Sequence, residues 1–211
     1  VRRFDLENGL TVLLRPDAAA PVVSVQIWVG VGSIHDQEFL GAGLSHYMEH
    51  MIFKGTPARP VGAITREIND AGGHVNAYTS FDRTVFYADL PAARWKVGLD
   101  VLADAVKNAN FPEDEWRRER EVVLREVSMG RDDPDRVISE RLWQTAYAVH
   151  PYRFPIIGLP ALLRQVERDD LLAFFQRHYV PDKMAVVVAG DIDPVDAEAA
   201  VLWCAQNLAQ T

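Results

Sequence analysis

Cysteine is almost absent from this chain of 211 residues, because Cys204 is the only one. A single thiol excludes an internal disulfide framework and a cysteine-rich zinc site. It is compatible with the cytoplasm, with the periplasm of a bacterium and with an organelle, so the compartment stays open.

Long apolar runs and clustered basic residues are also missing. No apolar stretch approaches the roughly 20 residues that cross a bilayer, so we expect no membrane span. The chain has 22 basic residues against 30 acidic ones, a formal net charge of -8, and no basic arm or stripe. Nucleic acid is therefore not an expected partner. No low-complexity linker and no short-period repeat divides the chain, and we expect a single domain over residues 1–211.

Strand and helix patterns are both present. Strand patterns occupy a hairpin at about 4–14 around Asn8-Gly9, and then about 22–31, 74–79, 84–90 and 184–189. Helical patterns cover about 44–53, 61–71, 93–109, 113–129, 132–148, 159–178 and 195–209. Because strict βαβ alternation is missing, the sequence predicts an α+β fold with a largely antiparallel mixed sheet and helices packed on it. We expect the tryptophans to anchor the core: Trp28, Trp95, Trp116, Trp143 and Trp203.

The predicted helix at 44–53 carries the pentapeptide His46-Tyr47-Met48-Glu49-His50. Two histidines four positions apart lie about one turn apart on one helix face, so both imidazoles can reach one metal ion. Glu49 lies near the same face and can reach a water on that metal. The order inverts the His-Glu-x-x-His zinc motif. A third protein ligand would leave a fourth position open, which is the pattern of catalytic zinc.

Candidates for that third ligand lie on the predicted helix at 113–129. Glu119 and Glu126 are seven residues apart and share one face, and Glu121 lies between them. Spacing alone does not choose among the three glutamates. The segment is also typical of a solvated, ion-paired helix, because it is rich in arginine: Arg117, Arg118, Arg120 and Arg125.

The residues around the pentapeptide closely resemble the insulinase (pitrilysin) family of zinc metallopeptidases, peptidase family M16, on its processing-peptidase-like branch. The resemblance covers nearly the whole chain in order. It is carried by Gly30-x-Gly32-Ser33, by the run from Gly41 to Thr56, by Gly72-Gly73-x-x-Asn76-Ala77-Tyr78-Thr79-Ser80, by Glu119 to Glu126, by His150-Pro151-Tyr152, by Tyr179-x-Pro181 and by Gly190-Asp191.

The resemblance implies one zinc ion per chain, held by His46, His50 and Glu126. It also implies that Glu49 is the general base, which takes a proton as water attacks the peptide carbonyl. Glu119 matches a second glutamate of the family on the same helix, and we expect it to support the ligands or their charge. The implied function is a zinc-dependent endopeptidase that hydrolyses peptides or presequences.

Asn76 and Ala77 match the edge strand of the family, where an extended peptide substrate adds as a further strand. The residues by themselves are more typical of an ordinary strand whose asparagine caps a turn. We therefore assign these two positions to substrate binding on the resemblance.

Family members are usually about twice this length, and the chain matches only their N-terminal domain. We therefore expect a second family domain in cis, or a partner subunit in trans, to complete the site. An alternative function is a non-catalytic substrate-binding or scaffold subunit of the same family, but such subunits typically lose a ligand or the base. S-ribosylhomocysteine lyase also has the His-x-x-Glu-His order, yet it uses a cysteine as third ligand, and Cys204 lies in an apolar helical segment.

Overall fold

The structure is a computed structural model that describes the backbone of residues 1–208 and the side chains of residues 1–205. Its centre is a six-stranded sheet with the order β1-β2-β6-β3-β5-β4. The strands are β1 (Arg2–Asp5), β2 (Thr11–Pro16), β3 (Val22–Val29), β4 (His74–Thr79), β5 (Thr84–Pro91) and β6 (Met184–Gly190). All neighbouring pairs are antiparallel except β2 and β6, which run parallel. The predicted α+β class with a largely antiparallel mixed sheet is confirmed.

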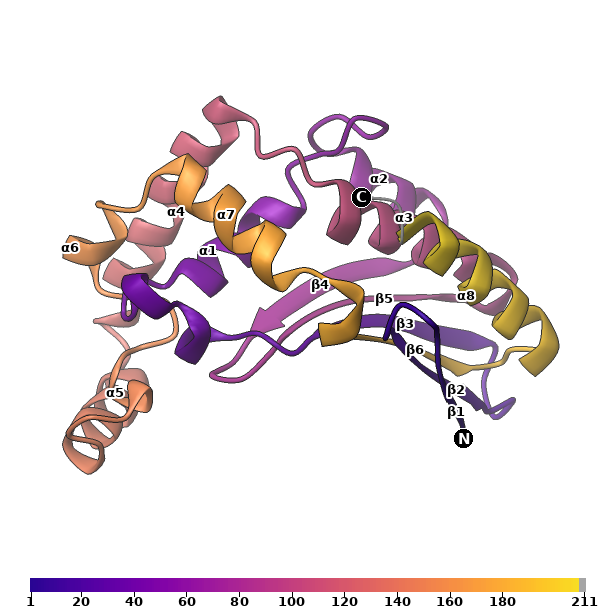
Figure 1. The fold of residues 1–211 in the computed structure, drawn as a ribbon, viewed down its shortest axis with the longest axis horizontal. Coiled ribbons are helices and arrows are strands. Elements are labelled where there is room, and N and C mark those ends of the chain that lie inside the picture. The colour runs from indigo at the N-terminus through magenta and orange to yellow at the C-terminus, as the bar shows by residue number, and fades with distance from the viewer. Residues whose placement is uncertain (209–211) are drawn as a thin grey trace.

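Helices lie on one side of this sheet, except that α5 projects away from it at one end of the molecule (Figure 1). They are α1 (Leu44–Ile52), α2 (Ala63–Asp70), α3 (Trp95–Asn108), α4 (Glu113–Gly130), α5 (Pro134–Ala146), α6 (Pro160–Leu163), α7 (Arg168–His178) and α8 (Pro194–Leu208). Short 3-10 segments are η1 (Ser33–His35), η2 (Gln37–Phe39), η3 (Ala92–Arg94), η4 (Pro151–Arg153) and η5 (Pro181–Lys183). Among the described residues, no helix is both long enough and apolar enough to cross a membrane.

Strand β3 illustrates why the helices lie on one face only. Its buried positions alternate along the chain and are all β-branched: Val23, Val25, Ile27 and Val29. Period-two alternation places these side chains on one face, where they join the hydrophobic core under the helices. The residues between them are half-buried and polar or aromatic, so the opposite face of the sheet is the more open one.

The helix predicted at 159–178 is two helices, α6 and α7. The chain turns between them so that Val166 is fully buried. Glu167 is extended there, and a capping box with Asp170 starts α7, in which the Glu167 amide donates to Asp170 Oδ2 at 2.8 Å. The continuous periodicity was misleading because burial of Val166 and the new cap replace about one turn of helix. The end predicted for the last helix, Ala209, lies outside the described residues.

Only two of the five tryptophans are core anchors. Trp95 and Trp116 are buried. Trp28 and Trp143 are half-buried, and the Trp203 side chain is 58% exposed on α8, so the prediction was wrong for these three. Trp28 lies on the more open face of β3, Trp143 packs against Phe81 outside the core, and Trp203 lies at a solvent-facing position of α8. Residue type alone does not reveal such positions.

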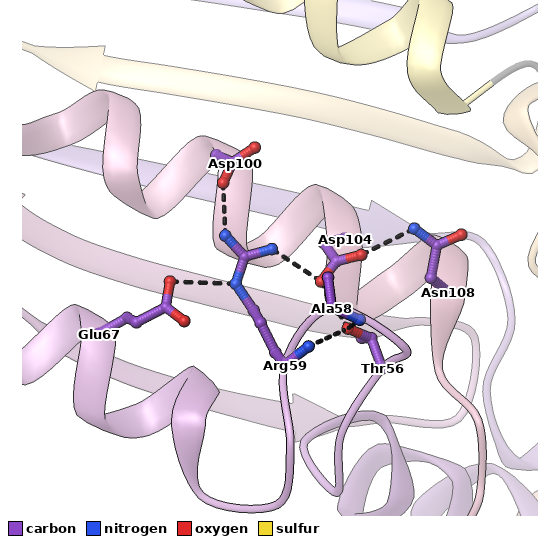
Figure 2. Close-up of polar contacts among 7 residues, drawn as sticks. All are labelled: Thr56, Ala58, Arg59, Glu67, Asp100, Asp104 and Asn108. Carbon is purple, nitrogen blue, oxygen red and sulfur yellow. Dashed lines mark hydrogen bonds and ion pairs between the residues drawn. The ribbon is translucent and has the colours of Figure 1, made fainter.

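A polar cluster ties the loop after α1 to α2 and α3, as Figure 2 shows. The Arg59 guanidinium lies 3.1 Å from Glu67, 2.5 Å from Asp100 and 2.7 Å from Asp104. Asp104 also accepts hydrogen bonds from Thr56 Oγ1 and Asn108 Nδ2, both at 2.7 Å. The loop that follows the histidine motif is thus fixed to the helical layer.

Candidate metal centre

Three side chains from α1 and α4 meet at one point. One ligand atom from each of His46, His50 and Glu126 lies within 4.8 Å of the other two. The Nε2 atoms of His46 and His50 are 3.9 Å and 3.6 Å from Glu126 Oε2. The third glutamate considered from spacing, Glu121, is exposed and belongs to no such group among the described residues.

Packing between α1 and α4 brings these residues together. Tyr47 follows His46 on α1 and is fully buried. Its hydroxyl donates a hydrogen bond to the carbonyl oxygen of Trp116 on α4. The two rings also stack, with centroids 6.5 Å apart. A tyrosine that is buried with its hydroxyl satisfied fixes the relative position of the two helices.

The start of α1 is capped from a distance by Asp36. Its N-cap residue, Gly43, has no side chain that could serve, and φ is +75° there. Asp36 instead accepts hydrogen bonds from Leu44 N at 3.0 Å, Ser45 N at 3.1 Å and Ser45 Oγ at 2.6 Å. Burial raises the pKa of Asp36 to about 7, although these hydrogen bonds oppose the rise. The helix that carries the motif is therefore anchored at its first turn.

Glu119 contacts both His50 and Lys54. Its Oε2 accepts from His50 Nδ1 at 3.0 Å, and its Oε1 pairs with Lys54 Nζ at 2.7 Å. Burial acts to raise the pKa of Glu119, but the hydrogen bonds from His50 and Lys54 outweigh it and hold that pKa below its usual value. Because Nδ1 donates to this carboxylate, the Nε2 atom of His50 is left to face Glu126.

His46 is held in its neutral form. Burial lowers its pKa to about 3, with smaller contributions from the nearby charges of His50 and Arg136. Its buried Nδ1 atom has no hydrogen-bond partner among the described residues. Imidazole nitrogens and a carboxylate are donors that zinc takes in catalytic sites, so these residues fit that ion.

Glu49 lies on the same helix as the two histidines, and its carboxylate is held from another element. Thr79 Oγ1, at the end of β4, donates to Glu49 Oε2 at 2.5 Å. Burial raises the pKa of Glu49, and the hydrogen bond from Thr79 only partly opposes this. A carboxylate with a raised pKa accepts protons more readily near neutral pH.

Asn76 and Ala77 lie on β4, which is an edge strand, because β5 is its only neighbour in the described sheet. Asn76 is exposed, and its Oδ1 accepts from Ala77 N at 2.9 Å. An exposed edge strand can pair with another extended chain.

A cavity of about 300 Å³ adjoins the cluster and is lined by His46, Glu126 and Thr79. Its wall is aromatic, because Phe81 stacks on Tyr152 at 4.4 Å between centroids and contacts Trp143 edge-on at 5.3 Å. At its rim, Arg136 Nε lies 3.3 Å from Glu140 Oε1 on α5. The sequence by itself did not assign these residues to the site, and the available signal was that Thr79 and Tyr152 belong to motifs of the resemblance.

A family model matches the part of the chain that contains all of these site residues. The sequence model described as "Insulinase (Peptidase family M16)" matches residues 11–158. A second model, described as "Peptidase M16 inactive domain", matches residues 165–202. The first match alone covers more than half of the chain.

Curated relatives are named as peptidases. The chain is 37% identical over 187 residues to the probable mitochondrial-processing peptidase subunit beta of Arabidopsis thaliana, covering 89% of this chain and 35% of the relative. It is 33% identical over 192 residues to the uncharacterized zinc protease YmxG of Bacillus subtilis (strain 168), covering 91% and 47%. A crystal structure of a protease from Helicobacter pylori shares 30% identity and a TM-score of 0.88, covering 94% of this chain and 48% of that one. The chain thus spans about half the length of these proteins or less.

Proposed function

The chain belongs to the insulinase family of peptidases, peptidase family M16, and from that premise we propose that it is the zinc-binding domain of an endopeptidase. The observation that carries the proposal is the meeting of His46, His50 and Glu126, with the Glu49 carboxylate beside them. This donor set has three protein ligands and so leaves one position for the reaction.

The chain's own residues supply binding, orientation and proton transfer. A zinc ion bound by the three ligands would lower the pKa of water in the site and polarise the peptide carbonyl. Glu49, close to the ligands and raised in pKa, takes the proton of the attacking water at its free carboxylate oxygen. It then gives that proton to the amine that leaves when the C–N bond breaks. Glu119 keeps His50 turned toward the centre through the bond to Nδ1.

The substrate we propose is an extended peptide, or a presequence, added to the free edge of β4. Backbone hydrogen bonds there, at Asn76 and Ala77, would hold the chain with little regard to its sequence. One substrate side chain would enter the aromatic-walled cavity next to His46 and Glu126. Because Phe81, Trp143 and Tyr152 line it, a large apolar or aromatic side chain fits best.

A second domain in cis, or a partner subunit in trans, belongs to the proposal, because the chain spans only 35% to 47% of the curated relatives. Holding the scissile bond against the nucleophile is worth about 7–11 kcal/mol of barrier in favourable cases. We therefore expect these 211 residues alone to show little activity, and activity to appear when the second half is supplied.

The test uses the full protein, its zinc content measured by mass spectrometry and its hydrolysis measured with a quenched peptide. Glu49→Gln keeps the size of the side chain but cannot take a proton, so zinc should remain while turnover falls by about 10²–10⁴. Turnover close to the parent would refute this role of Glu49. A parent that hydrolyses no peptide, even with its second half, would favour the non-catalytic alternative.

A further inference from the structure

The hydrogen bond between Thr79 and Glu49 joins two elements that are far apart in the sequence. Glu49 lies on α1, and Thr79 is the last residue of β4. The 2.5 Å distance is that of a strong hydrogen bond from a hydroxyl to a carboxylate. Resting on the proposed function, we propose that Thr79 is a positioning residue that holds the Glu49 carboxylate in the orientation needed to take a proton from water.

The direction of this hydrogen bond follows from the neighbours of Thr79. In β5, Thr84 lies opposite Thr79, and its own hydroxyl donates to the Val31 carbonyl oxygen at 2.9 Å. Thr84 is 1% exposed, so its hydroxyl takes its partner from the protein and not from water. The two threonine oxygens are 3.5 Å apart, much farther than Thr79 is from Glu49. The single proton of Thr79 therefore points at Glu49.

The carboxylate has two oxygens, and the structure gives them different surroundings. Oε2 accepts from Thr79, so Oε1 is left for the proton that comes off the water. Without the hydroxyl, the group can rotate about its last torsion, which is a broad, roughly two-fold torsion in glutamate. If the Glu49 carboxylate points at the water for a smaller fraction of the time, proton transfer becomes slower while substrate binding changes little.

The same strand supplies the proposed substrate edge. Side chains alternate along β4, so Thr79 shares a face with Ala77 two residues earlier, and both are half-buried. A peptide paired with the outer edge of β4 and the base held by Thr79 would then share one rigid frame. This places the scissile bond and the carboxylate in register through a single strand.

The experiment compares Thr79→Val, which keeps the shape and removes the hydroxyl, with Thr79→Ser, which keeps the hydroxyl. Both are made in the full protein, loaded with zinc and assayed with a quenched peptide. We expect Thr79→Val to keep its zinc, to lose about 10–100-fold in kcat and to change KM by less than about threefold. Thr79→Ser should recover most of the loss.

Thr11→Val is the matched control. Thr11 also lies on a strand, and it donates to a carboxylate, Asp5 Oδ1, at 2.7 Å, but on the exposed hairpin of β1 and β2. This variant should retain parent turnover. If Thr79→Val does not fold, as judged by thermal unfolding, the pair Thr79→Ser and Thr79→Ala makes the same comparison.

The outcomes separate this inference from the function on which it rests. Parent-like kcat in Thr79→Val, while Glu49→Gln is inactive, would overturn the role of Thr79 and leave the peptidase function standing. Equal losses in the Ser and Val variants, or a raised KM with unchanged kcat, would also overturn it, because the hydroxyl would then not act on the base. No effect of Glu49→Gln would overturn the proposed function and the role of Thr79 with it.

Discussion

Replacing Arg59 by methionine should destabilise the domain well beyond the effect of removing an ordinary surface ion pair. The Arg59 side chain is 13% exposed and faces three carboxylates, of which Asp104 is 12% exposed and the other two are 47% and 40% exposed. Breaking a buried pair by removing one partner typically costs about 3–5 kcal/mol. Because Asp100 and Glu67 can regain water, and Asp104 keeps Thr56 and Asn108, we expect the low end, about 3 kcal/mol.

For a domain of this size, each kcal/mol lowers the Tm by about 2–4 °C, so the expected shift is about 6–12 °C. The loss should also depend on pH. Burial acts to raise the pKa of Asp104, but hydrogen bonds from Asn108, Arg59 and Thr56 hold it below its usual value. A lowered folded-state pKa stabilises the fold above the unfolded-state pKa, near 3.8, and this is lost as pH falls. The gap between Arg59→Met and the parent should therefore be greatest near pH 7 and shrink below about pH 4.

Urea unfolding at several pH values measures both effects, with Lys96→Met as the control. Lys96 pairs with Asp196 at 2.6 Å, but both side chains are about half exposed (55% and 49%). Such a pair contributes about 0–1 kcal/mol. If Arg59→Met costs no more than Lys96→Met, or if its cost is independent of pH, the ion pairs of the cluster in Figure 2 do not stabilise the fold.

Three shorter predictions concern the candidate centre. Glu126→Gln should lower the zinc content measured by mass spectrometry while Glu121→Gln, on the exposed side of the same helix, leaves it unchanged; equal content in both would mean that another carboxylate holds the metal. Glu119→Gln should keep one zinc but weaken its affinity about 10–100-fold in a chelator competition, since its bond to His50 is charge-assisted; parent affinity would exclude the orienting role. Gly43→Ala should destabilise the fold in urea by more than about 2 kcal/mol, because φ is +75° and the new Cβ would lie 2.2 Å from the Ile157 carbonyl oxygen; a cost below about 1 kcal/mol would contradict this geometry.

Some features of the chain follow from local pattern. The alternation of Val23, Val25 and Ile27 specifies a strand with one buried face, because side chains repeat every two residues. The four-residue spacing of His46 and His50 puts both rings on one face of α1, because the helix turns every 3.6 residues. The structure reproduces both, since each depends only on backbone geometry over a few residues.

The choice among the glutamates of α4 is a matter of tertiary packing. Spacing left Glu119, Glu121 and Glu126 open, and the resemblance pointed to Glu126. In the structure Glu126 approaches both imidazoles, Glu119 reaches the far nitrogen of His50, and Glu121 faces solvent. That division depends on how α4 is rotated against α1, which the buried Tyr47 helps to determine.

The sequence alone therefore determined which segments form strands and helices, and that His46, Glu49 and His50 lie close together on one helix. By resemblance, it also determined the family. Only the tertiary structure decided that Thr79 holds Glu49, that Asp36 caps α1 from a distance, that Phe81, Trp143 and Tyr152 form one wall, and that Val166 interrupts a helical pattern. The physical reason is range. Periodicity records how neighbouring side chains share a face, whereas these contacts join segments whose approach depends on the packing of the whole core.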